Sequence, residues 1–277
     1  MRAAVEVGTA CGIRASEPVL LQETNNTVVW LRPSPVVAKV ATRPDSKLDV
    51  RLEHAVGSEL AALGADIAVP LPGLEPIEHL ASGFVVTLWE RLERVDAQAA
   101  DRSLSTSLAA LHGALARTRT KLPSFRAELM RARLALDDDT FMAALAPADR
   151  TFLRAVYDAG LAELDGVDLD RQRLHGEPHA GNRVLTAQGV RWIDFESCCV
   201  GPLEWDLAFQ SAEVSATFSD VDRDLLRRLR RLNSARVATW CWGTARFPEM
   251  RRHGEFHLQA LRAESNRAAE EPPAPGT

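Results

Sequence analysis

The segment from Leu174 to Asp194, LHGEPHAGNRVLTAQGVRWID, constrains the fold more strongly than any other part of the chain. Two short runs with strand character flank the tripeptide Ala-Gln-Gly at 187–189. A three-residue loop that ends in glycine is a common hairpin connection, because glycine adopts the left-handed conformation at little cost. A turn centred on Gln188 sets Asn182 opposite Asp194, with a tolerance of one residue if a strand carries a bulge.

Polar side chains gather at the open end of this predicted hairpin. Facing residues of an antiparallel pair have Cβ atoms about 4.5–5.5 Å apart. At that separation the amide oxygen of Asn182 and the carboxylate of Asp194 can hold a hard divalent cation such as Mg²⁺ between them. Glu177, which precedes Asn182 by five residues, adds a carboxylate that can act as a general base. We therefore expect a metal site with a base beside it.

The same segment allows a second interpretation, a metal cluster made of His175, Glu177 and His179. Alternate residues of a strand share one face, and imidazole and carboxylate groups are typical zinc ligands. However, the glycines and the proline among these residues disfavour a regular strand and favour a shaped loop. We therefore expect His175 to be a structural residue that hydrogen-bonds within the loop, and a His/Glu metalloenzyme is kept as an alternative.

Three motifs between residues 175 and 208, HGEPHAGN, WIDFE and GPLEWDLA, resemble those of the aminoglycoside phosphotransferase and choline kinase-like family. That family typically has H-G-D-x-x-x-x-N, I-D-[FW]-[ED] and G-x-x-x-x-D-L-A, a relative of the H-R-D and D-F-G segments of protein kinases. The main departure is Glu177, where the family usually has aspartate. The extra methylene group changes the reach of a carboxylate whose chemistry depends on positioning. This departure motivates another alternative, a non-catalytic nucleotide-binding pseudokinase.

The resemblance implies an α+β, bilobal protein-kinase-like fold. A small antiparallel β-rich N-lobe, residues 1–90, would bind the nucleotide, and a larger, mainly helical C-lobe, residues 91–268, would carry the catalytic loop and the acceptor pocket. Residues 269–277 are rich in Pro and Glu and are expected to form a disordered tail. The implied activity is Mg²⁺-dependent transfer of the γ-phosphoryl group of ATP or GTP to a hydroxyl of a small molecule. Aminoglycoside-like and other amine-bearing compounds are among the candidate acceptors.

The resemblance also implies roles for individual residues. Glu177 would be the catalytic base, and Asn182 and Asp194 would bind Mg²⁺. His175 and Asp206 would support the catalytic loop, the latter by accepting hydrogen bonds from backbone N–H groups of that loop.

The N-terminal part of the sequence contains three short apolar runs, at 19–21, 28–31 and 36–40, separated by turn-forming residues. This pattern predicts a meander of antiparallel strands. By the resemblance, the first turn of the meander covers the nucleotide phosphates with Thr24, Asn25, Asn26 and Thr27. A later strand, 83–89, leads into the hinge between the lobes, where Trp89 would pack near the adenine.

Lys39 lies in the run Val-Val-Ala-Lys-Val, which is otherwise suited to burial. An unpaired buried ammonium group is costly, so Lys39 must face water or have an acidic partner. Glu53 begins a helical pattern further along the chain, and the resemblance makes Lys39–Glu53 the ion pair that orients the nucleotide phosphates. Glu59, two turns further along the same helix, is the alternative partner.

Composition limits the remaining possibilities. The formal net charge of −5 gives no general attraction to nucleic acid, and the Arg-rich stretch 227–231 falls on a leucine-striped helix whose charged face is expected to be solvated. No apolar run approaches the roughly 18 residues of a membrane span, and the N-terminal residues lack the apolar core of a signal peptide. The four cysteines show no paired spacing, which favours a reducing cytoplasm. The expected partners are a nucleoside triphosphate and a small hydroxylated acceptor, and the oligomeric state stays open.

Overall fold

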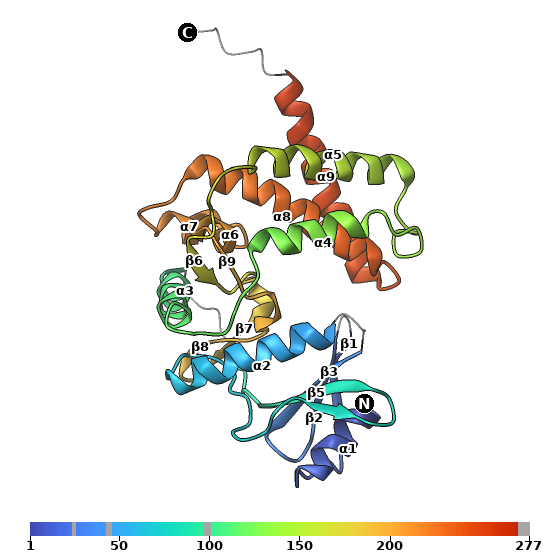
Figure 1. The fold of residues 1–277 in the computed structure, drawn as a ribbon, viewed down its shortest axis with the longest axis vertical. Helices are drawn as coiled ribbons and strands as arrows, with labels where there is room; N and C mark the ends of the chain where they lie inside the picture. Colours follow the sequence, from blue (N-terminus) through green and yellow to red (C-terminus); the bar gives the residue numbers. More distant parts are fainter. Residues whose placement is uncertain (24–25, 43–45, 97–100, 271–277) are drawn as a thin grey trace. The chain divides into compact units, whose positions relative to one another are not determined.

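The computed structural model describes all residues except 24–25, 43–45, 97–100 and 271–277. The chain forms two compact units, the first of residues 1–123 and 171–220 and the second of residues 124–170 and 221–277 (Figure 1). The first unit therefore contains both the β-rich N-terminal segment and the segment 174–194. The predicted lobes divide the chain once, after residue 90, whereas each compact unit consists of two segments of the chain. The predicted lobe boundary stays a prediction. Most of the predicted tail lies outside the described residues.

The first unit is built around a five-stranded antiparallel sheet. Valine recurs in these strands, as is usual on a pleated and half-buried surface. The predicted meander and the strand that ends near Trp89 are both confirmed. In spatial order the strands are β1 (Val19–Glu23), β2 (Thr27–Trp30), β3 (Val36–Ala41), β5 (Phe84–Glu90) and β4 (Ile77–His79).

Alternate residues of β3 face two environments, because successive side chains of a strand point to opposite sides of the sheet. One set is buried in an apolar core together with helix α1 (Arg2–Ala10): Val36, Ala38 and Val40. The other set, Val37 and Lys39, lines a cavity. Helix α2 (Ser46–Ala62) follows β3 in the chain, and it begins seven residues before the predicted start, so that Glu53 lies in its interior.

The remainder of the first unit combines short strands with short helices. Strands β6 and β9 pair antiparallel with each other, and β7 pairs with β8 to form the predicted hairpin. The helices α3 and α7 are in contact. These elements are α3 (Asp101–Leu115), β6 (Gln172–Leu174), β7 (Arg183–Thr186), β8 (Gly189–Trp192), β9 (Cys199–Gly201), α6 (Leu203–Leu207) and α7 (Ala212–Ala216).

The β7–β8 hairpin differs by one residue from the predicted register. Thr186 pairs with Gly189, so the loop has the two residues 187 and 188 instead of three. Gly189 has a φ of 114°, and it uses the conformational freedom of glycine inside the pair rather than in the loop. The N–H of Ile193, and not that of Asp194, consequently donates to the carbonyl of Asn182, at 3.0 Å.

The second unit consists mainly of helices (Figure 1). Helix α8 contacts the other three long helices of the unit. It starts after the predicted residue 222, because the side chain of Asp222 accepts from the N–H groups of Asp224 and Leu225. Among the described residues, no helix is both long enough and apolar enough to cross a membrane. The helices are α4 (Phe125–Ala135), α5 (Pro147–Glu163), α8 (Arg223–Gly243) and α9 (Pro248–Glu270).

Candidate active site

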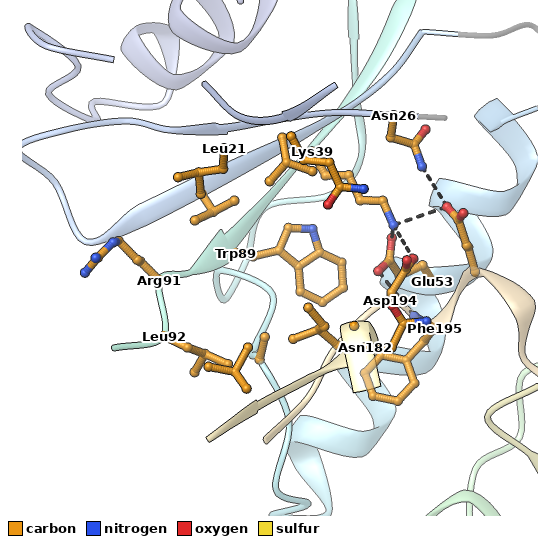
Figure 2. A pocket seen from close by; sticks show the side chains of 18 of the residues that line it. Leu21, Asn26, Lys39, Glu53, Trp89, Arg91, Leu92, Asn182, Asp194 and Phe195 are labelled. Atoms are coloured by element: carbon orange, nitrogen blue, oxygen red, sulfur yellow. Dashed lines mark hydrogen bonds and ion pairs between the residues drawn. The ribbon is translucent and has the colours of Figure 1, made fainter. Parts of the chain in front are cut away.

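Lys39 is buried and lies at the centre of a cluster of charges in the first unit (Figure 2). The residue pairs with Val28 of β2 and Thr87 of β5, so its backbone is held in the interior of the sheet. Its Nζ lies 2.7 Å from Oε2 of Glu53 on α2, which confirms the predicted ion pair. The same nitrogen lies 2.6 Å from Oδ1 of Asp194 and 3.1 Å from Oε2 of Glu196.

The alternative partner of Lys39, Glu59, is engaged elsewhere. Its Oε1 accepts from the hydroxyl of Thr120 at 2.6 Å and from the N–H of the same residue at 3.0 Å. Glu53 is therefore the helical partner of Lys39. The side chain of Glu53 is only 4% exposed, and its Oε1 accepts from the N–H of Phe195 at 3.3 Å, which links α2 to the segment that carries Asp194.

The cluster contains more negative charge than Lys39 neutralises. Burial, together with the charge of Asp194, outweighs the opposing charge of Lys39 and raises the pKa of Glu53 to about 7 and the pKa of Glu196 to about 8. Burial alone would lower the pKa of Lys39, but the charges of Asp194, Glu196 and Glu53 outweigh it and raise that pKa well above its usual value. The electrostatic balance therefore favours an additional cation.

The oxygen atoms of this cluster are suited to a divalent metal ion. One carboxylate oxygen from each of Glu53, Asp194 and Glu196 lies within 4.8 Å of the other two. Mg²⁺ and Ca²⁺ prefer such hard oxygen ligands. Glu196 was not among the predicted metal ligands. The family pattern contains an acidic residue at this position, but nothing in the spacing of the sequence places it against Lys39.

Asn182, the other predicted metal ligand, lines the same cavity as Asp194. Its Nδ2 donates to the backbone carbonyl of Glu177 at 2.9 Å, which orients the amide within the loop. Asp194 adopts the left-handed conformation, with a φ of 68° and a ψ of 65°. Every other positive φ among the described residues belongs to a glycine. A left-handed conformation costs a non-glycine residue on the order of 1 kcal/mol, and such strain is typical of functional sites.

The cavity has a volume of about 510 Å³ and lies in the first unit (Figure 2). One part of its lining is apolar and includes Leu21, Trp89 and Leu92, and another part contains the charged cluster. The Trp89 side chain is held in place, since its indole N–H donates to the hydroxyl of Thr87 at 2.9 Å. A pocket with an apolar part and a few convergent polar groups is typical of small-molecule sites.

The predicted phosphate-covering turn is only partly described. Thr24 and Asn25 lie outside the described residues. Asn26 lines the cavity, and its Nδ2 donates to Oε2 of Glu196 at 2.8 Å (Figure 2). Thr27 is buried as the first residue of β2 and pairs with Val40, and it is not among the described residues that line the cavity.

Asp206 braces the loop that precedes the hairpin. Its Oδ2 accepts from the N–H of His175 at 3.0 Å, and its Oδ1 accepts from the N–H of Gly176 at 2.8 Å. His112, on α3, contacts Oδ2 of the same carboxylate through Nε2 at 2.7 Å, a contact that no sequence pattern predicts. Gly176 has a φ of 83°, and a Cβ atom there would lie 1.9 Å from the carbonyl oxygen of Ser197. The loop therefore requires glycine at this position.

His175 is a structural residue in this loop. Its ring is fully buried, contacts the rings of Trp192 and Phe195, and places Nε2 3.1 Å from the carbonyl oxygen of Ile193. Its Nδ1 accepts from the N–H of Glu177 at 3.3 Å. Burial lowers the pKa of this histidine. Because both ring nitrogens are engaged within the fold, the arrangement does not support the alternative in which His175 binds zinc.

Glu177 is not among the described residues that line the cavity. Its carboxylate accepts from the hydroxyl of Ser197 at 3.3 Å and lies 3.8 Å from Nε2 of His179. The structure thus brings together Lys39, Asn182 and Asp194 at one cavity. The predicted base, Glu177, has a side chain that is 24% exposed and contacts His179, which belongs to the described lining.

Comparison with known proteins agrees with this geometry. A model of the phosphotransferase enzyme family matches residues 19–247. No curated protein matches the chain by sequence alone. Among solved structures, choline kinase LicA from Streptococcus pneumoniae is similar with a TM-score of 0.68 and 13% identity, over 95% of this chain and 99% of that one.

Two other structures with nucleotides bound are similar to the same extent. The GDP and kanamycin complex of APH(2")-IIia has a TM-score of 0.65 and 13% identity, over 98% of this chain and 99% of that one. Amicoumacin kinase hAmiN in complex with AMP-PNP, Ca²⁺ and Ami has a TM-score of 0.67 and 12% identity, over 94% of this chain and 92% of that one. These likenesses confirm the predicted bilobal, kinase-like α+β fold.

Proposed function

The chain belongs to the phosphotransferase enzyme family, and on that basis we propose that it is a Mg²⁺-requiring small-molecule kinase. It would transfer the γ-phosphoryl group of ATP or GTP to a hydroxyl of a small molecule. The observation that carries this proposal is the convergence of Lys39, Glu53 and Asp194 at a cavity that is also lined by Asn182. Phosphoryl transfer depends mainly on positioning and electrostatic stabilisation, and these are what such a cluster supplies.

The nucleotide would occupy the cavity of about 510 Å³, a volume within the usual range for small-molecule sites. Its base would contact the apolar side chains of Leu21, Trp89 and Leu92, and its phosphates would reach Lys39. The ammonium group would be oriented by Glu53 and would hold the phosphates that are not transferred. Asn26, on the turn after β1, would lie close to the phosphates.

Asn182 and Asp194 would hold Mg²⁺, since both line the cavity and offer oxygen ligands. When bound, Mg²⁺ neutralises negative charge on the phosphate oxygens. Glu177 would accept the proton of the acceptor hydroxyl as the γ-phosphoryl group moves through a loose transition state. Asp206, which accepts hydrogen bonds from two backbone N–H groups of the loop, would keep Glu177 in position.

The acceptor is best sought among amine-bearing compounds. The chain carries a formal net charge of −5, which suits a cationic substrate. Related structures are a choline kinase and complexes with kanamycin and with amicoumacin. These names describe those proteins, and they guide the choice of compounds for this one.

The direct test is a screen of Mg·ATP and Mg·GTP consumption over a panel of hydroxylated metabolites and antibiotics. The expected result is nucleotide consumption that depends on one class of acceptor, together with a product heavier by one phosphoryl group in mass spectrometry. Consumption of nucleotide without any phosphorylated acceptor across the panel would contradict the proposal.

A nucleotide-binding pseudokinase is the second candidate, and one observation favours it. Glu177 replaces the usual aspartate of the family, and its carboxylate contacts Ser197 and His179 instead of lining the cavity. This candidate predicts binding of nucleotide without turnover for every acceptor. It also predicts that Glu177→Asp gains turnover, whereas the kinase proposal predicts turnover in the unmodified protein.

A further inference from the structure

Three hydrogen-bonded side chains lie where helix α1 meets the end of strand β4. The hydroxyl of Ser82 lies 2.7 Å from Nδ1 of His79, and Nε2 of the same ring lies 2.6 Å from Oε2 of Glu6. None of the three is among the described residues that line the cavity of the candidate active site. We propose that this Ser82–His79–Glu6 relay makes Ser82 a nucleophile that accepts an acyl group from a small activated acyl donor.

The relay has the arrangement of a nucleophile, a base and a group that orients the base. In such arrangements neighbouring groups lie about 2.6–3.2 Å apart, and both contacts of the relay fall within that range. Ser82 belongs to the turn between β4 and β5, His79 is the last residue of β4, and Glu6 comes from α1. The relay is therefore assembled by the fold and not by the turn alone.

The hydrogen bonds indicate where the protons lie. The N–H of Phe84 donates to Oγ of Ser82 at 3.4 Å, which leaves the hydroxyl proton for Nδ1 of His79. A neutral imidazole that accepts at Nδ1 carries its own proton on Nε2, and it donates that proton to Glu6. The hydrogen bond from His79 is the main cause that lowers the pKa of Glu6, so this carboxylate is ionised.

The base is shielded from water, whereas the nucleophile is accessible. The side chain of His79 is 8% exposed, and Ser82 is exposed. Hydrogen bonds to a buried imidazole are electrostatically stronger than those in water. A cation also lies beside the turn, because a Cβ atom on Gly83 would be 3.8 Å from Nζ of Lys47. This ammonium group is suited to negative charge that develops on the donor.

The transfer needs the acyl donor as its co-reactant. Oγ of Ser82 forms a bond to the carbonyl carbon of the donor, and Nδ1 of His79 takes the hydroxyl proton. Glu6 stabilises the imidazolium that forms. The bond between the carbonyl carbon and the leaving group then breaks, the leaving group departs with the electron pair, and His79 gives it the proton. The product is an ester of Ser82, and nothing is oxidised or reduced.

The test treats the full-length protein with p-nitrophenyl acetate and follows the acetylation of each serine by mass spectrometry. Ser82 should be acetylated at least about tenfold faster than Ser219. Ser219 is the matched comparison, because it is also exposed but donates to the carboxylate of Asp220 at 3.1 Å. Ser82→Ala should remove the fast acetylation and the release of p-nitrophenol that accompanies it.

The role of Glu6 is tested by Glu6→Gln, which keeps the length of the side chain and removes its charge. This variant should acetylate Ser82 at least about tenfold more slowly than the unmodified protein. Glu17→Gln, at an exposed glutamate outside the relay, is the control and should leave the rate at Ser82 unchanged.

Two results would overturn the inference. One is an equal acetylation rate of Ser82 and Ser219 in the unmodified protein, a comparison that requires no variant to fold. The other is an unchanged rate at Ser82 in Glu6→Gln while that variant melts cooperatively, because the three side chains would then not act as a unit. Neither measurement involves a nucleotide, so the outcome is independent of the proposed kinase activity.

Discussion

Glu177 is the residue through which binding and catalysis can be separated. Its carboxylate is not part of the cavity lining, so Glu177→Ala should leave nucleotide affinity nearly unchanged. Loss of a general base typically lowers the rate by about 10²–10⁴-fold. The measurement is the affinity for the nucleotide by calorimetry alongside the turnover number for the acceptor that the screen identifies.

The isosteric variant Glu177→Gln is the control for a change of shape, and it should lose turnover to the same extent as Glu177→Ala. A wild-type rate in either variant would remove Glu177 from the role of base.

Asp194 should affect binding instead. In Asp194→Ala the site loses a carboxylate that lies 2.6 Å from Lys39 and lines the cavity, so Mg²⁺ should no longer strengthen nucleotide binding. Calorimetry with and without Mg²⁺ measures this difference directly. The exposed residue Asp168 provides a matched control, because Asp168→Ala should retain the full metal dependence. Persistence of the metal effect in Asp194→Ala would contradict its role as a ligand.

At the scale of single elements, local sequence patterns predicted whether a segment is a helix or a strand better than they predicted where it begins and ends. The strands β2, β3 and β5 and the helix α8 were expected from apolar periodicity and turn residues. Helix α2 was expected to begin at Glu53, but its first turns carry Lys47, Asp49 and Arg51, whose polarity hides the helical period. The β7–β8 loop is one residue shorter than predicted, because glycine is compatible with a loop position and also with the residue pair that closes the loop.

The start of α8 gives an element-scale prediction. Asp222 accepts from two N–H groups of the first turn, and its replacement by alanine leaves them without that partner. Asp222→Ala should lower the free energy of unfolding by about 1 kcal/mol, which corresponds to roughly 2–4 °C in Tm for a domain of this size class. Asp220→Ala, at an exposed acid just before the helix, is the control. Equal melting temperatures for Asp222→Ala and the unmodified protein would show that the cap contributes nothing.

At the scale of the whole molecule, the excess of carboxylates predicts how stability depends on pH. The pKa of Glu53 is raised to about 7 and that of Glu196 to about 8, mainly by burial. The folded protein therefore retains protons that the unfolded chain releases above pH about 4.5. This contribution to stability is fully present below that pH and is lost as the pH rises through 7 and 8.

Urea denaturation at about pH 6 and about pH 8.5 tests the expectation. Glu196→Gln removes one of the two titrating groups, so it should lose less stability between these pH values than the unmodified protein, with a difference of at least about 1 kcal/mol. Glu249→Gln, at an exposed position, should follow the unmodified protein. If Glu196→Gln shows the same loss as the unmodified protein, the raised pKa of Glu196 is not a property of the folded state.

The sequence by itself determined the family motifs, the hairpin at 183–192, the loop braced by Asp206 and the pairing of Lys39 with Glu53. These features depend on residue types at short spacings, or on motifs whose residues the family resemblance assigns. Only the tertiary structure decided that Asp194 and Glu196 both contact Lys39, and Asp194 is 155 residues away from it in the sequence. The shift of the hairpin register by one residue was likewise visible only in the structure. The physical reason is that a buried ammonium group pairs with the carboxylates that the packing of α2 against the sheet brings close to it. No local sequence pattern predicts which carboxylates these are.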